Sequence, residues 1–327
     1  MIFANIAELN TMDNIYIFML IAITVLATID IVVGVSNDAI NFLNSAIGSK
    51  AISMRMIMTV ASLGIFFGAV YSSGLMEVAR KGIFIPAMFS FNEIMYIFMA
   101  VMITDILLLD FFNTLGLPTS TTVSIVFNLL GAAVIMSLIK IGANDGQSFG
   151  DLVNYINTTK ALQIVSGIVM SVFIAFTVGA IVQWTSRLIF TFQTQEKIKN
   201  FGAIFGAIAL TAITYFIFLK GLKGTPYYKD LKGSIEGNEF YIMGASFALW
   251  LIVSFVFQAI TKKTILLVVI AVGTFGLALA FSGNDLVNFI GVPMAAYHSY
   301  EAWAASGVEA TQFSMEVLDK KVPAEPL

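Results

Sequence analysis

Residues 36–49 read SNDAINFLNSAIGS and place three asparagines and one aspartate where a long apolar run ends. In a helix, Asn37 and Asn41 are four positions apart and share one face, with Asp38 beside them. A charged aspartate at the centre of a membrane helix is disfavoured by about 2.5–3.5 kcal/mol on insertion scales. A simple membrane anchor would avoid these residues, so the stretch indicates a polar site inside a membrane protein.

The composition around this stretch is that of a membrane protein. Of the 327 residues, 58% are hydrophobic and 11% are charged, whereas a soluble domain has roughly 25% charged residues. Apolar stretches of about 20 residues, long enough to cross a bilayer, recur along the chain. The sequence therefore predicts an all-α, polytopic transmembrane protein. The net charge of −3 leaves no basic face for nucleic acid, and the absence of cysteine excludes thiolate chemistry.

The apolar runs predict eight membrane spans, and polar glycine-containing loops at 140–160 and 221–238 separate groups of them. Lysine and arginine are shared almost evenly between the two sides, so the charge rule for loops does not set the orientation. The predicted spans are 15–36, 54–76, 92–113, 119–139, 161–186, 201–220, 239–261 and 264–282.

The opening stretch recurs near the end of the chain. Residues 36–43 read SNDAINFL and residues 283–290 read GNDLVNFI, so two asparagines, an aspartate and a phenylalanine repeat at identical spacing. Seven predicted spans precede the one that leads into the second copy, so the two copies enter the membrane from opposite sides. This parity predicts an inverted repeat, with a first repeat at 1–139, connecting helices at 140–263 and the start of a second repeat at 264–327.

The two copies, which we call the first and second signatures, have the chemistry of a cation site. Carboxylates, carboxamides and the carbonyls of an interrupted helix offer oxygen ligands, and Gly34 and Gly48 are positions where such an interruption could occur. Hydrogen bonding between helices is the structural alternative, but the duplication favours a functional site. The predicted cation ligands are Asn37, Asp38, Asn41, Asn284, Asp285 and Asn288, with sodium expected at Asp38 and Asp285.

A second constellation is the hydroxyl segment Thr119, Ser120, Thr121 and Thr122, which follows Pro118 and precedes an apolar run. Proline suits the start of a helix, so the hydroxyls are expected in its first turn, beside backbone N–H groups that lack a partner. Hydroxyl donors and the positive end of a helix dipole favour an anion. An ordinary capped helix start is the alternative.

The charge balance of these motifs suggests co-transport. No lysine or arginine occurs in 1–49, 91–139 or 264–319, the regions that contain the motifs. An anion bound there needs companion cations, which the signature aspartates can hold. Asp30 and Asp105 also lie inside predicted spans, where an ionisable group indicates function by default; a place in a cation pathway and a structural role are both kept open for them.

Together, GVSNDAINFLNSAIGSK (34–50), GLPTSTT (116–122) and SGNDLVNFIGVP (282–293) resemble the inorganic phosphate transporter (PiT) family, and MEVARKGI (76–83) is similar to a further segment of it. The resemblance implies an inverted-repeat secondary transporter with broken helices and a re-entrant hairpin. It implies cation-coupled phosphate symport by alternating access in the cell (inner) membrane, with no organic cofactor and no enzymatic activity. It places the signature asparagines and aspartates near sodium, and Ser120, Thr121 and Thr122 on phosphate.

Some features depart from the family pattern. Ser36 and Gly283 replace the alanine that precedes the signature asparagine, and Val123 stands where many relatives have a histidine. The family's second hydroxyl-bearing hairpin is missing from the sequence, so a truncated chain is expected. Sulfate as substrate, protons as coupling ion, a passive anion channel and assembly into a homo-oligomer are alternatives that the sequence leaves open.

Overall fold

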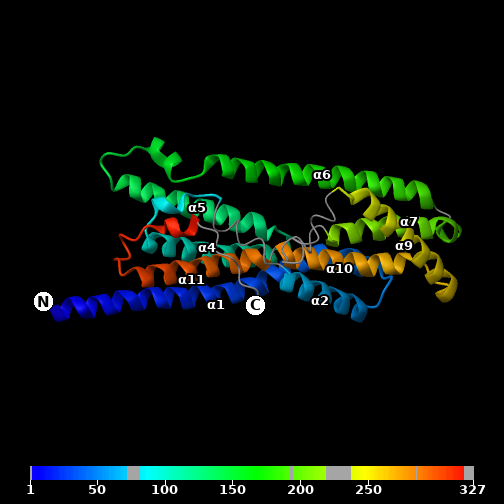
Figure 1. Ribbon diagram of the computed structural model, residues 1–327, viewed down its shortest axis with the longest axis horizontal. Helices are drawn as coiled ribbons and strands as arrows, with labels where there is room; N and C mark the ends of the chain where they lie inside the picture. The colour runs from blue at the N-terminus through cyan, green and yellow to red at the C-terminus, as the bar shows by residue number, and fades with distance from the viewer. Residues whose placement is uncertain (1, 72–81, 192–193, 219–236, 285, 320–327) are drawn as a thin grey trace. The chain divides into compact units, whose positions relative to one another are not determined.

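The computed structural model describes residues 2–71, 82–191, 194–218, 237–284 and 286–319. These residues form helices without a β-strand, apart from two isolated bridge pairs (Figure 1). The long helices are α1 (Ile2–Ser49), α2 (Met54–Tyr71), α4 (Phe91–Thr114), α5 (Thr121–Gly142), α6 (Thr158–Phe190), α7 (Thr194–Phe216), α9 (Glu239–Thr261), α10 (Leu266–Asn284) and α11 (Leu286–Ser306). Short 3₁₀ turns cover Pro86–Met88, Phe149–Asn154 and Met315–Asp319.

The all-α membrane class is confirmed. Within the described ranges, six helical segments are long and apolar enough to cross a bilayer, namely Asn14–Ser49, Phe91–Thr114, Thr121–Gly142, Thr158–Phe190, Glu239–Thr261 and Leu266–Ser306. Two shorter apolar helices, Met54–Val70 and Phe201–Phe216, fall in the remaining predicted spans. Helix α11 was not predicted, because the expected last span ended at the second signature.

The chain forms two compact units that alternate along the sequence. Unit 1 contains Met1–Asp38, Leu75–Gly167 and Asp285–Leu327, and unit 2 contains Ala39–Gly74 and Ile168–Asn284. This packing division differs from the three consecutive segments proposed from the repeat, which stay a prediction. Both signatures contain a point where the chain passes from one unit to the other, after Asp38 and after Asn284.

Unit 1 is built from α4, α5, α11 and the first part of α1. Its core includes an aromatic cluster in which Phe91 stacks on Trp303 at 4.5 Å between ring centroids. Tyr16 of α1 meets both rings edge-on, at 4.9 and 5.1 Å. At the same end of the α4–α5 hairpin, Lys140 of α5 pairs with Glu93 of α4 at 2.8 Å. Glu93 also accepts from the Ser90 N–H in the capping box that begins α4.

Unit 2 is built from α2, α7, α9, α10, most of α6 and the last part of α1. Gly64 and Gly68 of α2 face the backbone of α10, where a Cβ on Gly64 would stand 2.6 Å from the Phe275 carbonyl oxygen. Such a pair of small residues four apart lets two membrane helices approach closely. Ser282 adds a 2.8 Å hydrogen bond to the Ile65 carbonyl.

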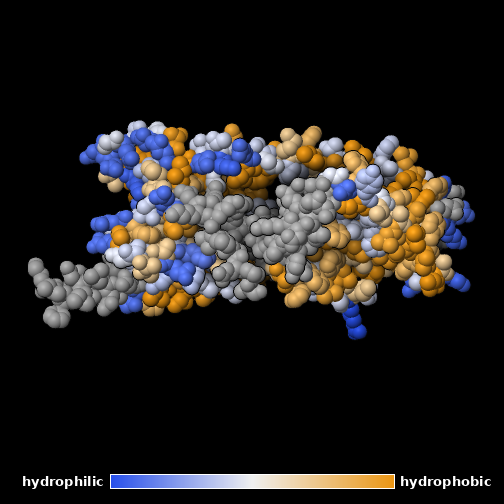
Figure 2. All heavy atoms as spheres, viewed as in Figure 1, coloured by the Kyte–Doolittle hydropathy of each residue, from blue (hydrophilic) through white to orange (hydrophobic). Residues whose placement is uncertain are grey.

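The apolar residues left outside these cores suit contact with lipid. None of the α6 residues is buried, and side chains such as Phe176 and Phe240 are 77% and 84% exposed. Figure 2 shows broad hydrophobic surface over α9 and α10 on the face it presents. An exposed apolar surface of this extent is stable in hydrocarbon and unfavourable in water.

Helix α1 corrects one expectation. The interruption predicted near the first signature is absent, since α1 runs without a break from Ile2 to Ser49. A glycine lowers helix stability by about 1 kcal/mol relative to alanine, which is too little to break a helix whose backbone groups need partners in a membrane. Gly34 instead allows close packing, because an added Cβ there would overlap the ring of Phe289.

Candidate functional site

Asn37 ties the first signature to the turn between α4 and α5. Its Nδ2 donates to Asn113 Oδ1 at 2.7 Å and to the Leu117 carbonyl at 3.0 Å. Its Oδ1 accepts from the Thr119 N–H at 2.8 Å. Asn113 in turn donates to the Val33 carbonyl at 3.0 Å. One 5% exposed carboxamide therefore fixes the turn that leads into the hydroxyl segment.

The hydroxyl segment spans the start of α5 and partly corrects the sequence analysis. Helix α5 begins at Thr121, so Pro118 and Thr119 precede the helix and Ser120 is its N-cap. Ser120 has an extended backbone, and its Oγ accepts from the Val123 N–H at 3.4 Å. Asn37 accepts the N–H of Thr119, which precedes the helix, and the helix starts two residues later than expected.

Thr121 and Thr122 occupy the first turn of α5 and differ in their partners. Thr122 Oγ1 accepts from Asn288 Nδ2 at 2.8 Å. Thr121 is 1% exposed, and its Oγ1 has no hydrogen-bond partner within the described part of the chain. The first backbone N–H groups of the helix also lack intrahelical acceptors. This arrangement gives an anion several donors at a positive helix end.

The two signatures therefore meet at the hydroxyl segment from opposite ends of the sequence. Asn37 of the first signature binds the Thr119 N–H, and Asn288 of the second binds the Thr122 hydroxyl. Phe289 of the second signature lies against Gly34, two residues before the first signature on α1. Residues from three motifs that are far apart in sequence, Asn37, Thr119–Thr122 and Asn288, thus lie together in unit 1.

The other predicted cation ligands are placed as follows. Asp38 is 4% exposed and lies beside Asn37 on α1. Asn41 is exposed and belongs to unit 2. Asp285 and the side chain of Asn284 lie outside the described residues. Sequence reasoning missed Asn113, for which the only signal was an amide at the end of an apolar span.

A group of buried polar side chains lies deeper between α1, α4 and α5. Asp30 and Asp105 are both 0% exposed. Their carboxyl groups lie close enough to share a hydrogen bond. Asp105 Oδ1 accepts from Ser124 Oγ and, at 2.8 Å, from Asn128 Nδ2. Sequence analysis identified both acids but not their pairing, since 75 positions separate them along the chain.

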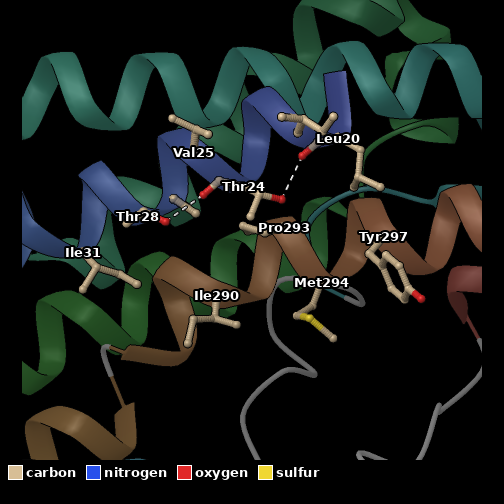
Figure 3. Close-up of a pocket in the computed structure, with 11 residues that line it drawn as sticks. Leu20, Thr24, Val25, Thr28, Ile31, Ile290, Pro293, Met294 and Tyr297 are labelled. Carbon is tan, nitrogen blue, oxygen red and sulfur yellow. Dashed lines mark hydrogen bonds between the residues drawn. The ribbon is translucent and has the colours of Figure 1, made fainter. Parts of the chain in front are cut away.

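A cavity of about 500 Å³ lies between α1 and α11 and lacks the polar donors of the hydroxyl segment (Figure 3). Its walls are almost entirely apolar and include Ile31, Ile290 and Met294. The two threonines in it, Thr24 and Thr28, use their hydroxyls as donors to carbonyls of their own helix. The cavity offers no charge for an anion, so the hydroxyl segment is the better candidate site.

Comparison with known proteins places these motifs in context. Residues 34–318 match the phosphate transporter family. A predicted phosphate permease of Thermococcus kodakarensis is 25% identical over 290 residues, which cover 84% of this chain and 65% of that protein. One from Pyrococcus abyssi is 26% identical over 277 residues with the same coverage. The chain thus spans 65% of the length of these relatives.

A solved structure shares the fold. The sodium-dependent phosphate transporter superimposes with a TM-score of 0.62 at 20% sequence identity, covering 92% of this chain and 72% of that chain. At this level of identity the likeness establishes the fold.

Proposed function

Because this chain belongs to the phosphate transporter family, we propose that it takes part in moving inorganic phosphate across a membrane, with the hydroxyl segment as the anion site. The convergence of both signatures on Thr119–Thr122 carries this proposal. The relatives are predicted phosphate permeases, and the structural neighbour is a sodium-dependent phosphate transporter.

The local chemistry supports an oxyanion as the substrate. Ser120, Thr121 and Thr122 offer hydroxyl donors, and the start of α5 adds backbone N–H groups and its dipole. Thr121 Oγ1 is buried without a hydrogen-bond partner among the residues described, so a ligand oxygen would satisfy it. Lys140 is unavailable to the anion, because it lies at the last turn of α5 and pairs with Glu93.

The anion's charge must be balanced by a companion cation. We propose that this cation is sodium, bound by Asp38 with Asn37, Asn41 and Asn288, and by Asn284 and Asp285 at the repeated position. A carboxamide oxygen has two lone pairs, so Asn37 Oδ1 can accept from Thr119 and still face a cation. Moving one negative charge against a membrane potential requires about 2.3 kcal/mol per 100 mV, which co-transported sodium removes.

Alternating access is the proposed mode of transport. The chain divides into two units, and both signatures contain a crossing between them. Ligands bound at the signatures can therefore influence how the units move. The apolar helices support an integral membrane protein, and we propose the cell membrane as its location.

Uptake of radiolabelled phosphate into proteoliposomes tests this function. We expect accumulation that depends on an inward sodium gradient, is lost in Asp38→Asn and is retained in Asp110→Asn, whose acid is exposed on α4. Excess unlabelled phosphate should compete and sulfate should not. Stronger competition by sulfate would reassign the substrate, and equal uptake with and without a gradient would refute sodium coupling. Uptake that only equilibrates would indicate a channel.

A further inference from the structure

The Asp30–Asp105 pair is a buried acidic group that the phosphate and sodium sites do not use. Asp30 lies on α1, two helical turns before Asp38, which is about 12 Å along the axis at 1.5 Å per residue. Asp105 lies on α4. Both side chains are fully buried within unit 1, where an ionised carboxylate is costly unless it is paired and hydrogen-bonded.

The two acids of the pair receive different numbers of hydrogen bonds from their neighbours. Asp105 Oδ1 receives two donors, from Ser124 Oγ and from Asn128 Nδ2. Apart from the contact between the two acids, both oxygens of Asp30 and Oδ2 of Asp105 have no hydrogen-bond partner among the described residues. Asp105 is therefore arranged as an acceptor, and Asp30 has no donor that would stabilise a negative charge.

Among the residues that the structure describes, no positive side chain compensates the pair. Helix α5 faces it with the uncharged Ser124 and Asn128. The other acids of α4 are Glu93, which pairs with Lys140, and Asp110, which is exposed.

The remaining titratable groups nearby in the fold lie on α11 and α1. On α11, His298 and Glu301 pair with each other at 3.4 Å, and Tyr297 lines the apolar cavity. Among the α1 residues whose side chains the structure describes, 14–49, the other acid is Asp38. The pair must therefore take its compensating charge from a bound cation, because two adjacent buried carboxylates cannot both stay ionised.

We propose that Asp30 and Asp105 form a proton-binding site, in which Asp30 carries one exchangeable proton and donates it in a hydrogen bond to Asp105 Oδ2. The side chains around the pair present donors, from Ser124 and Asn128, and a sodium ion would require acceptors. The proton converts two buried charges into one, and that charge is stabilised by three hydrogen bonds. The site goes beyond the proposed sodium and phosphate sites and does not depend on the substrate.

Infrared spectroscopy of the purified protein tests this proposal without a transport assay. A buried carboxylic acid has a carbonyl-stretch band separate from that of a carboxylate, and the band shifts in D₂O if the proton exchanges. At neutral pH we expect the wild-type protein to show such a band, Asp30→Asn to lose it and the matched control Asp110→Asn to keep it. Asparagine resembles a protonated aspartate in shape and can donate to Asp105, so the variant is expected to fold.

Three results would overturn the proposal. The first is a wild-type spectrum without a protonated-acid band at neutral pH. The second is an unchanged band in Asp30→Asn. The third is loss of the band when sodium is added at constant pH, which would assign the pair to sodium. If Asp30→Asn does not fold, Ser124→Ala replaces it: removing a donor to Asp105 should shift the wild-type band, and an unshifted band would contradict the assignment.

Discussion

Asn37 has a structural role that its position in the signature did not reveal. The repeat marked it as a functional residue, and this interpretation depended only on residue type and spacing. Its partners Asn113, Leu117 and Thr119 lie 76 to 82 positions away in sequence. A single sequence does not encode which distant turn a buried carboxamide contacts, so the fixing of the hydroxyl segment became visible only in the structure.

Replacing Asn37 by leucine should destabilise the protein. The change leaves the Thr119 N–H and the Asn113 and Leu117 carbonyls without their partner, and each unsatisfied buried group costs about 1–3 kcal/mol. We expect a clearly lower midpoint of thermal unfolding in detergent. Asn14→Leu on the same helix is the control, because Asn14 is exposed. Equal midpoints for the two variants would show that the hydrogen bonds contribute little.

At the scale of the helix, glycine residues that look alike in sequence have different roles. Gly34 and Gly48 both flank the first signature, and both were read as positions where α1 could break. The helix continues through both. Gly34 accommodates the Phe289 ring, whereas no atom lies within 4 Å of a Cβ added at Gly48. The locations of most helices followed from apolar length alone, but this distinction depends on tertiary packing.

These two glycines form a matched pair for mutagenesis. In Gly34→Ala the new methyl group overlaps the Phe289 ring, and overpacking of this kind typically costs about 1–3 kcal/mol. In Gly48→Ala the helix gains propensity without a clash. We expect the first variant to unfold at lower temperature and the second to match or exceed the wild type. A Gly34→Ala protein as stable as Gly48→Ala would argue against close packing of the signatures.

In unit 2, the close contact between α2 and α10 leads us to predict that a glycine-to-alanine change is destabilising there too. A Cβ at Gly64 would stand 2.6 Å from a backbone carbonyl oxygen of α10, and a backbone atom cannot move aside as a flexible side chain can. Gly64→Ala should therefore reduce the free energy of unfolding by about 1–3 kcal/mol. Gly131→Ala, at an open position on α5, serves as control. Similar unfolding of both variants would show that α2 and α10 do not need this close approach.

At the scale of the whole molecule, the division into two units was not predictable from the sequence. The repeat suggested three consecutive segments, whereas the packing units alternate along the chain and change within both signatures. The sequence analysis identified the membrane class, the family resemblance and the hydroxyl segment, because these depend on composition and local motifs. The assignment of each segment to a unit depends on contacts between distant residues.

Alternating access predicts that the units move when ligands bind. The chain has no cysteine, so pairs of spin labels can be introduced without background. We expect phosphate with sodium to change the distance distribution between labels at Ile139 in unit 1 and Leu249 in unit 2, which are 60% and 59% exposed. Labels at Ile139 and Phe111, both in unit 1, should report an unchanged distance. An unchanged distribution between units would contradict alternating access.

Equilibrium binding of radiolabelled phosphate to purified Thr122→Val tests the central claim most directly. Thr122 accepts from Asn288 in the second signature, and valine keeps its shape but removes the hydroxyl. Ser137→Ala is the control, since the buried Ser137 hydroxyl bonds only to the Ala133 carbonyl of its own helix. We predict about tenfold weaker binding for Thr122→Val, equivalent to about 1.4 kcal/mol, and unchanged binding for Ser137→Ala. Wild-type affinity in Thr122→Val would place the phosphate site elsewhere.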